Sequence, residues 1–168
     1  VVIAELSREK DVAALVRRIR RLPRLEALVS NAGYGIGLPF HAVPVQDHLR
    51  MVAVHVTAAL HLVHAALPGM RERRSGTIIT VASMAAFLPL PNSAVYCGTK
   101  AFLRGMTESL AIETAADGIR VQCLCPGLVD TDFHRRRPAP KEHHPGSGLI
   151  PWMGPARVVE RSMRDLAR

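Results

Sequence analysis

The stretch GTIITVAS, residues 76–83, decides the fold of this 168-residue chain. Its centre is a run of β-branched residues, and small or polar residues bound the run on both sides. A short run of this kind is typical of a strand that is covered on both faces of its sheet. We therefore predict a buried strand here and look for its neighbours on either side.

Two further stretches predict strands of similar length. LEALVS, residues 25–30, precedes the first, and IRVQCLC, residues 119–125, follows a turn at Asp117 and Gly118. Amphipathic stretches predict helices over residues 7–22, 44–67, 93–114 and 154–168. Strands that alternate with helices in this way predict an α/β protein with a Rossmann-like doubly wound parallel sheet in three α/β/α layers.

The helix that is expected to begin at Pro44 has the strongest amphipathic pattern. Its apolar residues recur every three or four positions, which predicts one buried face. These residues are Val45, Leu49, Val52, Val56, Leu60, Val63 and Leu67. Pro68 and Gly69 are expected to end or kink this helix, and Ser7 is expected to cap the helix over residues 7–22. The N-terminal VVIA, residues 1–4, begins as a short β-branched run of the kind found in strands.

The composition is that of one ordinary globular domain, with 48% hydrophobic and 21% charged residues. His, Arg or Pro interrupts each apolar stretch before it reaches bilayer-spanning length, so we expect no transmembrane helix and no membrane partner. The N-terminus lacks the pattern of a signal peptide. Cys97, Cys123 and Cys125 have no metal-ligand spacing, and the simplest interpretation is three free thiols in a reducing cytoplasm, with no metal site.

The formal net charge of +8 lies largely toward the C-terminus, where RRRPAPKEHH covers residues 135–144. A segment of this kind is compatible with a nucleic-acid contact or with a solvated loop. No aromatic residues are interleaved with the charges and no nucleic-acid motif accompanies them, which favours the loop. We therefore expect no nucleic-acid partner, although a basic surface beside a pocket would favour an anionic ligand.

Candidate functional residues lie at the predicted carboxyl ends of the strands, which is where parallel α/β sheets bind ligands. These ends are VSNAG (residues 29–33), TVASMAA (80–86) and LCPGLVDT (124–131), each with small or polar residues after an apolar run. Gly33 in the first lets the backbone approach a ligand without an intervening side chain, although a flexible turn would use the same residue.

Tyr96 and Lys100 lie four positions apart in the helix that follows the central strand. Side chains at this spacing leave one helix face a turn apart, which a surface helix can also show by chance. An ammonium close to a phenol favours the phenolate and lowers a pKa that is ordinarily near 10. Ser83 lies 13 residues before Tyr96 and lacks the Gly-x-Ser-x-Gly setting of a nucleophile, so it suits a hydrogen bond to a substrate oxygen. The three side chains are suited to protonating a carbonyl while a cofactor supplies hydride.

Taken with two further motifs, these residues resemble the short-chain dehydrogenase/reductase family. Four signatures match in order: NAG at residues 31–33, Ser83 after an apolar strand, Tyr-x-x-x-Lys at 96–100, and Pro-Gly-x-Val-x-Thr at 126–131. The resemblance implies an oxidoreductase that transfers a hydride between NAD(P)(H) and a small-molecule carbonyl or alcohol. It makes Tyr96 the general acid/base, Ser83 the group that orients the substrate, and Lys100 the group that lowers the Tyr96 pKa and bonds the nicotinamide ribose.

The same resemblance implies the contacts with the cofactor, NAD or NADP. On the adenosine side it places Asn31, Ala32 and Gly33, and around the nicotinamide it places Pro126, Gly127, Val129 and Thr131. Glu5 and Leu6 fall where the family usually has Asp and an aliphatic residue near the adenine. The residue that discriminates NAD from NADP follows the family's second strand, which this sequence lacks, so both cofactors stay open.

The expected partners are a substrate and a second copy of the chain. Four residues near the strand ends suggest an apolar ketone or alcohol, namely Phe87, Leu88, Leu90 and Phe133. The loop from Leu128 to Pro151 is expected to help select the substrate. The resemblance also implies a homo-oligomer that forms through the two long helices.

One departure from the family pattern lies in the helix that begins at Pro44. The family usually has an Asn-Val pair here, whose Asn holds a water of the proton relay, whereas this sequence has His55 and Val56. An imidazole both donates and accepts, so His55 can replace the Asn and make the relay pH-sensitive. The alternative is a helix histidine with no catalytic part.

The second departure is the absence of the family's Gly-rich strand–turn–helix, which binds the pyrophosphate through backbone N–H groups. Residues 1–168 are therefore expected to form a single partial domain, from about the family's third strand through the helix after the sixth. This leaves LEALVS as an unprotected sheet edge, so the chain as given should bind dinucleotide poorly and aggregate. The alternative function is a non-catalytic remnant that associates through its long helices.

Overall fold

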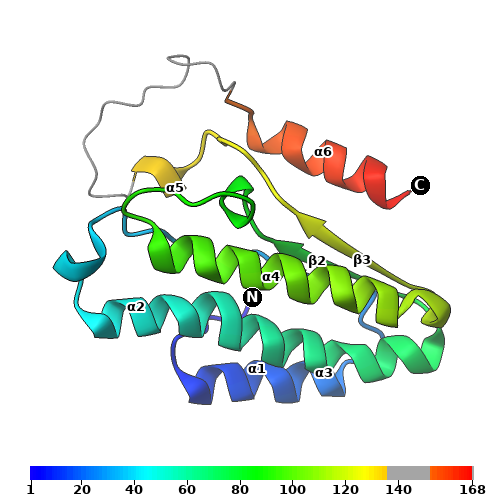
Figure 1. Cartoon of the computed structure of the whole chain (residues 1–168). Coiled ribbons are helices and arrows are strands. Elements are labelled where there is room, and N and C mark those ends of the chain that lie inside the picture. The colour runs from blue at the N-terminus through cyan, green and yellow to red at the C-terminus, as the bar shows by residue number, and fades with distance from the viewer. Residues whose placement is uncertain (136–151, 168) are drawn as a thin grey trace.

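The computed structural model describes residues 1–135 and 152–167 (Figure 1). Most of the basic segment RRRPAPKEHH, and most of the loop between Leu128 and Pro151, lie outside the described residues. The label η marks a 3-10 turn, except for η2, which is a π-helical turn. The elements along the chain are α1 (Glu9–Arg21), β1 (Ala27–Ser30), η1 (Phe40–Ala42), α2 (Val45–Val52), η2 (Ala53–Thr57), α3 (Ala58–Arg73), β2 (Gly76–Val81), η3 (Met84–Ala86), α4 (Ala94–Glu113), η4 (Ala115–Asp117), β3 (Ile119–Leu124), α5 (Asp132–Arg135) and α6 (Pro155–Leu166).

The three predicted strands are confirmed and form one parallel sheet in the order β1-β2-β3. The register places Val29 of β1 opposite Ile79 of β2, and Ile78 of β2 opposite Val121 of β3. Each crossover between neighbouring strands contains a helix, as parallel pairing requires. The predicted α/β class and parallel sheet are therefore correct.

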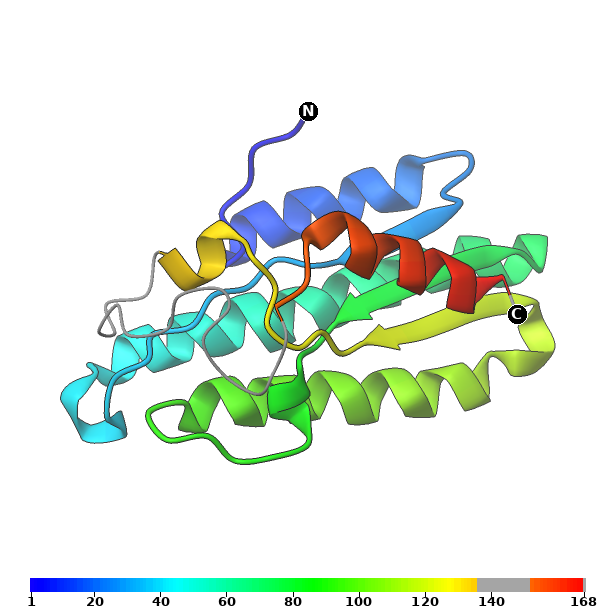
Figure 2. The same cartoon turned by 90° about the horizontal axis from the view of Figure 1, so that it is seen from above.

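Helices lie on both sides of this sheet. Leu28, Ile78 and Val121 share one face and belong to a core cluster with residues of α3, and α1 and α4 contribute side chains to the same cluster. Gln122 points to the other face, where its side-chain amide donates to the Ser162 carbonyl of α6 at 3.1 Å. Figures 1 and 2 show β2 and β3 between α6 on one side and α3 and α4 on the other. The three-layer arrangement is present but incomplete, because among the described residues α6 contacts the second face at β3 and leaves Val29 of β1 exposed there.

The edge strand β1 is exposed, as its position predicts. Val29 on the second face of the sheet is 56% exposed, whereas Ile79 beside it on β2 is 7% exposed. Residues 1–4 form no strand, contrary to the β-branched pattern of VVIA. A strand needs a hydrogen-bonded neighbour, and among the described residues no strand pairs with residues 1–4.

The long helix differs from its prediction in three ways. It runs through Pro68 and ends at Arg73, and it contains the π-helical turn η2 in its middle. The buried face consists of Met51, His55, Ala58, Ala59, Val63, Ala65, Ala66 and Met70. Of the predicted stripe, Val45, Leu49 and Leu60 are exposed instead. A π-helical turn adds one residue to the helical repeat, which rotates the sequence pattern relative to the sheet.

By length and composition alone, one described helix, the continuous run Val45–Arg73, could cross a membrane. The expectation that His, Arg and Pro would rule out such a helix is therefore wrong by this criterion. The core helix of a globular protein meets the same criterion, and this helix packs against α1, β1 and β2.

Two local predictions at helix starts have opposite outcomes. Ser7 does not cap α1, because its hydroxyl and its backbone N–H both donate to the Glu5 carboxylate, at 3.0 and 3.1 Å. The predicted C-terminal helix begins as expected, with Pro155 in the first turn of α6.

Candidate active site

The predicted site residues gather at the carboxyl ends of the three strands. Asn31, Ala32 and Gly33 follow β1, Ser83 lies two residues after β2, and Pro126 lies two residues after β3. The order β1-β2-β3 places these ends along one edge of the sheet. The structure therefore places the sequence motifs where the prediction located the site.

Ser83 begins the turn between β2 and η3. Its backbone is extended and its Oγ accepts a hydrogen bond from the Ala85 N–H at 3.2 Å, which fixes the side chain at the start of η3. The next residue, Met84, donates its N–H to the Pro126 carbonyl at 2.9 Å and so joins this turn to the segment after β3. The turn also packs against α4, the helix that carries Tyr96.

Lys100 is the most deeply buried charged residue of the site, at 4% exposed. Its Nζ donates to the Val81 carbonyl at 2.8 Å and lies 5.7 Å from the centre of the Tyr96 ring. Burial lowers the pKa of Lys100 from 10.5 to about 8, and the nearby Cys123 and Cys125 act in the opposite direction. The ammonium is therefore still mostly protonated at pH 7 and stands beside the phenol, as the four-residue spacing predicts.

The Tyr96 ring lies between two other rings at the site. Its centre is 5.9 Å from that of His55 and 5.9 Å from that of Phe133. Phe133 thus reaches the predicted catalytic tyrosine. Phe87 lies on the surface instead, where the Arg104 guanidinium stacks 4.4 Å from its ring, and Leu88 and Leu90 nearby are also exposed.

His55, which lies in η2, is 1% exposed and uses both ring nitrogens. Its Nε2 accepts from the Tyr34 backbone N–H at 3.0 Å. Because that nitrogen must accept, the proton resides on Nδ1, which donates to the Thr99 Oγ1 at 2.9 Å. Thr99 in turn donates to the Tyr96 carbonyl at 2.8 Å. His55 therefore links the loop after β1 to the backbone of α4, the helix that carries Tyr96.

The titration expected for His55 is wrong for this fold. Burial, together with the neighbouring Lys100 charge, lowers the pKa of His55 from 6.5 to about 3. The imidazole is thus neutral near pH 7, in one fixed tautomer. Its tight packing also explains Gly33, because a Cβ at that position would lie 3.0 Å from the His55 Nε2 and 3.5 Å from the Lys100 Nζ.

A cavity of about 460 Å³ opens beside the NAG segment. Glu5, Leu6 and Ala32, three residues predicted for the adenosine side of a cofactor, all line it. Tyr34 and Arg50 complete this wall, and Asp47 pairs with Arg50 at 3.1 Å. The structure therefore brings together the N-terminal segment and the loop after β1, which are far apart in the sequence.

The segment predicted to border a nicotinamide is half-buried along Pro126, Gly127 and Val129. A Cβ at Gly127 would lie 3.4 Å from the Met84 sulfur, so this segment lies close against the turn that holds Ser83. Val129 forms a parallel bridge with Met153, and Thr131 bonds back to the Val129 carbonyl at 3.5 Å. The Thr131 hydroxyl therefore forms a hydrogen bond within this segment.

Three residues at the site were not predicted. Thr99 could have been found, because it occupies the YCGTK motif on the turn between Tyr96 and Lys100. The Tyr34 N–H and the Arg50 side chain could not, because their roles depend on how the loop after β1 folds against α2 and η2.

Comparisons with known proteins identify the family of this chain. A family model described as short chain dehydrogenase matches residues 1–142. The inactive 2-(S)-hydroxypropyl-CoM dehydrogenase 2 of Xanthobacter autotrophicus is 37% identical over 135 residues, 79% of this chain and 59% of that protein. The very-long-chain 3-oxoacyl-CoA reductase of Pyrenophora tritici-repentis is 30% identical over 165 residues, 97% of this chain and 46% of that protein.

A solved structure shows the same fold. The short-chain dehydrogenase from Sphingobium yanoikuyae, in complex with NADPH, superposes with a TM-score of 0.89 at 26% identity, over 98% of this chain and 63% of that one. The chain spans about half the length of the curated relatives it matches. Motifs, fold and family match agree: the chain belongs to the short-chain dehydrogenase/reductase family of oxidoreductases.

Proposed function

We propose that the protein to which this chain belongs transfers a hydride between NAD(P)(H) and a carbonyl or alcohol substrate, with Tyr96 as general acid/base. The observation that carries the proposal is Lys100, a buried ammonium held 5.7 Å from the Tyr96 ring at the carboxyl end of the sheet. A buried cation beside a phenol favours the phenolate and so brings the phenol closer to proton exchange near neutral pH.

The described residues fit a dinucleotide on its adenosine side. The cavity beside Glu5, Leu6 and Ala32 has a carboxylate at its rim and apolar walls, as a ribose and an adenine require. When bound, the nicotinamide would supply the hydride. Pro126, Gly127 and Val129 would hold the nicotinamide end, next to the turn that carries Ser83.

Each residue of the site then has a defined task in the reduction direction. The Ser83 hydroxyl holds the substrate carbonyl oxygen, and Tyr96 gives that oxygen its proton. Lys100 stabilises the phenolate that remains, and in the opposite direction the phenolate takes the proton from the alcohol. His55 holds the loop after β1 against α4 through its two hydrogen bonds, and it carries no proton in the cycle because both of its nitrogens are committed.

The substrate we propose is an apolar ketone or alcohol. Phe133 supports this, since its ring lies 5.9 Å from that of Tyr96 and would contact a substrate held there. A cytoplasmic location is proposed on the three free cysteines.

A second candidate function is association without catalysis. Apolar side chains remain exposed on both long helices, at Val45, Leu49 and Leu60 of the first and at Phe102 and Ile112 of α4. Such residues suit a homo-oligomeric helix interface. A relative named as inactive shows that members of the family exist without activity.

The two chain tyrosines provide a direct test of the catalytic proposal. Replacing Tyr96 by Phe removes the proton donor, so reduction of an apolar ketone with NADPH or NADH should fall at least about 100-fold. The comparison is Tyr34→Phe, which keeps the backbone N–H bond to His55 and changes only a side chain that lines the proposed cofactor cavity, so its effect should fall on the KM for the cofactor and leave kcat within a few-fold. Activity is measured by the absorbance of the reduced cofactor, with each cofactor in turn, in the protein that contains these residues. Equal activity of Tyr96→Phe and the parent would refute the proposal, and inactivity of a folded parent that forms oligomers would favour the second function.

A further inference from the structure

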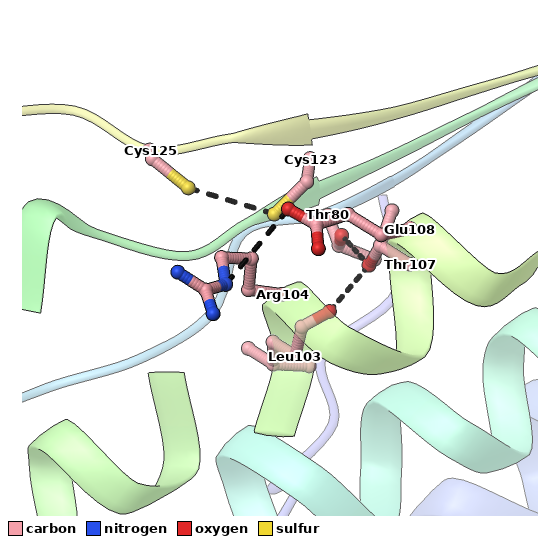
Figure 3. A network of polar contacts seen from close by, with 7 residues as sticks. All are labelled: Thr80, Leu103, Arg104, Thr107, Glu108, Cys123 and Cys125. Carbon is pink, nitrogen blue, oxygen red and sulfur yellow. Dashed lines mark hydrogen bonds and ion pairs between the residues drawn. The ribbon is translucent and has the colours of Figure 1, made fainter. Parts of the chain in front are cut away.

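Cys123 and Cys125 form a pair of thiols outside the proposed catalytic residues. They lie at the end of β3 and one residue beyond it, and side chains two positions apart on a strand point to the same face. Their sulfurs are 3.6 Å apart, and Figure 3 shows them directed toward each other. Both residues are half-buried, and neither forms a disulfide.

The surroundings hold this pair in place. Cys123 lies opposite Thr80 in the register of β2 and β3, and Thr80 hydrogen-bonds Thr107 of α4. Figure 3 shows this network beneath the sulfurs, with the Arg104–Glu108 ion pair next to it. Both cysteines also pack against the apolar cluster that contains Leu103. The thiol pair is therefore backed by ordered side chains on its helix side.

The distance between the sulfurs distinguishes two possible uses of the pair. A disulfide needs the sulfurs at about 2.0 Å, with a Cα separation that two positions of an extended strand barely allow. One atom bonded to both sulfurs at about 2.3 Å with a near-tetrahedral angle would instead hold them about 3.8 Å apart. The observed 3.6 Å is the contact distance of two free thiols, which excludes a disulfide as they stand and lets one atom bridge them after a shift of only a few tenths of an ångström.

We propose that Cys123 and Cys125 are a two-thiol binding site for one thiophilic centre, of which a trivalent organoarsenical is the chemical type. A centre that bonds just two sulfurs suits the site, since no group of three or more His, Cys, Asp or Glu residues is assembled within residues 1–135 and 152–167. A structural zinc ion would need four ligands.

The reaction at this site involves no change of oxidation state. Each S–H bond breaks, an As–S bond forms to each sulfur, and the oxygen of an arsenoxide leaves as water with the two thiol protons. Burial and the adjacent Cys125 raise the pKa of Cys123 to about 12, so this thiol stays protonated at neutral pH. The net reaction consumes two protonated thiols and releases water, and because the thiolate is the attacking form, the raised pKa slows the reaction without changing its balance.

Phenylarsine oxide tests the site without any need for cofactor binding. The folded 168-residue chain should take up one phenylarsenic group with loss of two thiol hydrogens, as native mass spectrometry detects. Excess 2-mercaptoethanol should leave this product intact, because two sulfurs must be displaced together, whereas a dithiol such as dithiothreitol should remove it. Circular dichroism before and after labelling checks that the chain stays folded.

Single cysteine variants identify the sulfurs. Cys123→Ser and Cys125→Ser should each lose the monothiol-resistant product, and Cys97→Ser, which removes the third thiol on α4, should retain it in full. Cys123→Ala and Cys125→Ala provide a second pair of variants where a serine does not fold. The proposal is overturned if the parent product is removed by 2-mercaptoethanol, or if it persists in a folded variant that lacks Cys123 or Cys125.

Discussion

At the scale of single residues, His55 differs most from what the sequence suggests. An isolated histidine titrates near neutral pH, but this one is enclosed by the loop after β1, by α4 and by the Lys100 ammonium. A helix pattern shows where a histidine lies along the chain and contains no information on the donors that will face its ring. Position 55 could thus be recognised as a departure from the family, whereas its fixed tautomer could not.

The depressed pKa of His55 predicts a specific loss of stability in acid. The folded pKa is about 3 and the ordinary value is 6.5, so the unfolded chain binds more protons between these pH values. The free energy of unfolding should therefore fall as the pH drops through this window, by roughly 2 kcal/mol between pH 7 and pH 4.5. In the His55→Asn variant this contribution disappears.

Urea unfolding at both pH values measures this contribution. His61→Asn is the matched control, because His61 is an exposed histidine in the same long helix. The parent and the control should lose stability in acid to the same extent, and His55→Asn should lose less. If all three proteins show the same pH dependence, His55 is not buried as a neutral imidazole.

At the scale of elements, the strands could be predicted from the sequence, but which face of the long helix is buried could not. Gly76–Val81 is buried on both sides, so its composition alone indicates a central strand. The helix over Val45–Arg73 contains apolar residues on more than one face, and Val45 and Leu49 fit a stripe that the structure exposes. The π-helical turn η2 shifts the register of the residues on its two sides, and it contains the buried His55. A local apolar pattern does not show such a turn.

Two glycines predict opposite effects of alanine on element stability. A Cβ at Gly105, in the exposed middle of α4, would meet no atom within 4 Å, so Gly105→Ala should stabilise the fold by about 0.5–1 kcal/mol. Gly118 before β3 has φ of 70° and its added Cβ would collide with the Arg74 carbonyl, so Gly118→Ala should cost more than about 1 kcal/mol. Urea midpoints compare the two variants with the parent. If Gly118→Ala raised the free energy of unfolding, this result would contradict the positive φ of Gly118 in the turn between η4 and β3.

At the scale of the whole molecule, the sheet determines how this chain behaves in solution. The parallel sheet could be predicted from three apolar runs joined by helices, and the exposed edge could be predicted from the resemblance to the family, whose first strand–turn–helix this sequence lacks. The cavity between the N-terminal segment and the loop after β1 could not, because Glu5 and Ala32 meet only when α1 folds back along α3.

The exposed edge predicts self-association of the 168-residue chain. Val29 on β1 offers an apolar side chain next to unpaired backbone groups, and a lysine there should discourage strand pairing between copies. Val29→Lys should therefore lower the light scattering of concentrated samples while the circular dichroism spectrum stays unchanged. Ile79→Lys, on the adjacent buried strand, is the comparison and should unfold the chain. Aggregation of a folded Val29→Lys protein equal to that of the parent would assign self-association to another surface.

The hydrogen-bond chain from the Tyr34 N–H through His55 and Thr99 to the Tyr96 carbonyl also has a thermodynamic consequence. The loop beside the cavity that we propose for a cofactor and the helix that carries Tyr96 lose their conformational freedom together, because one imidazole restrains both. A ligand that orders the loop leaves less disorder for a second ligand to remove at the helix. Binding of either ligand should therefore raise the affinity for the other, and the factor should be the same whichever of the two ligands binds first.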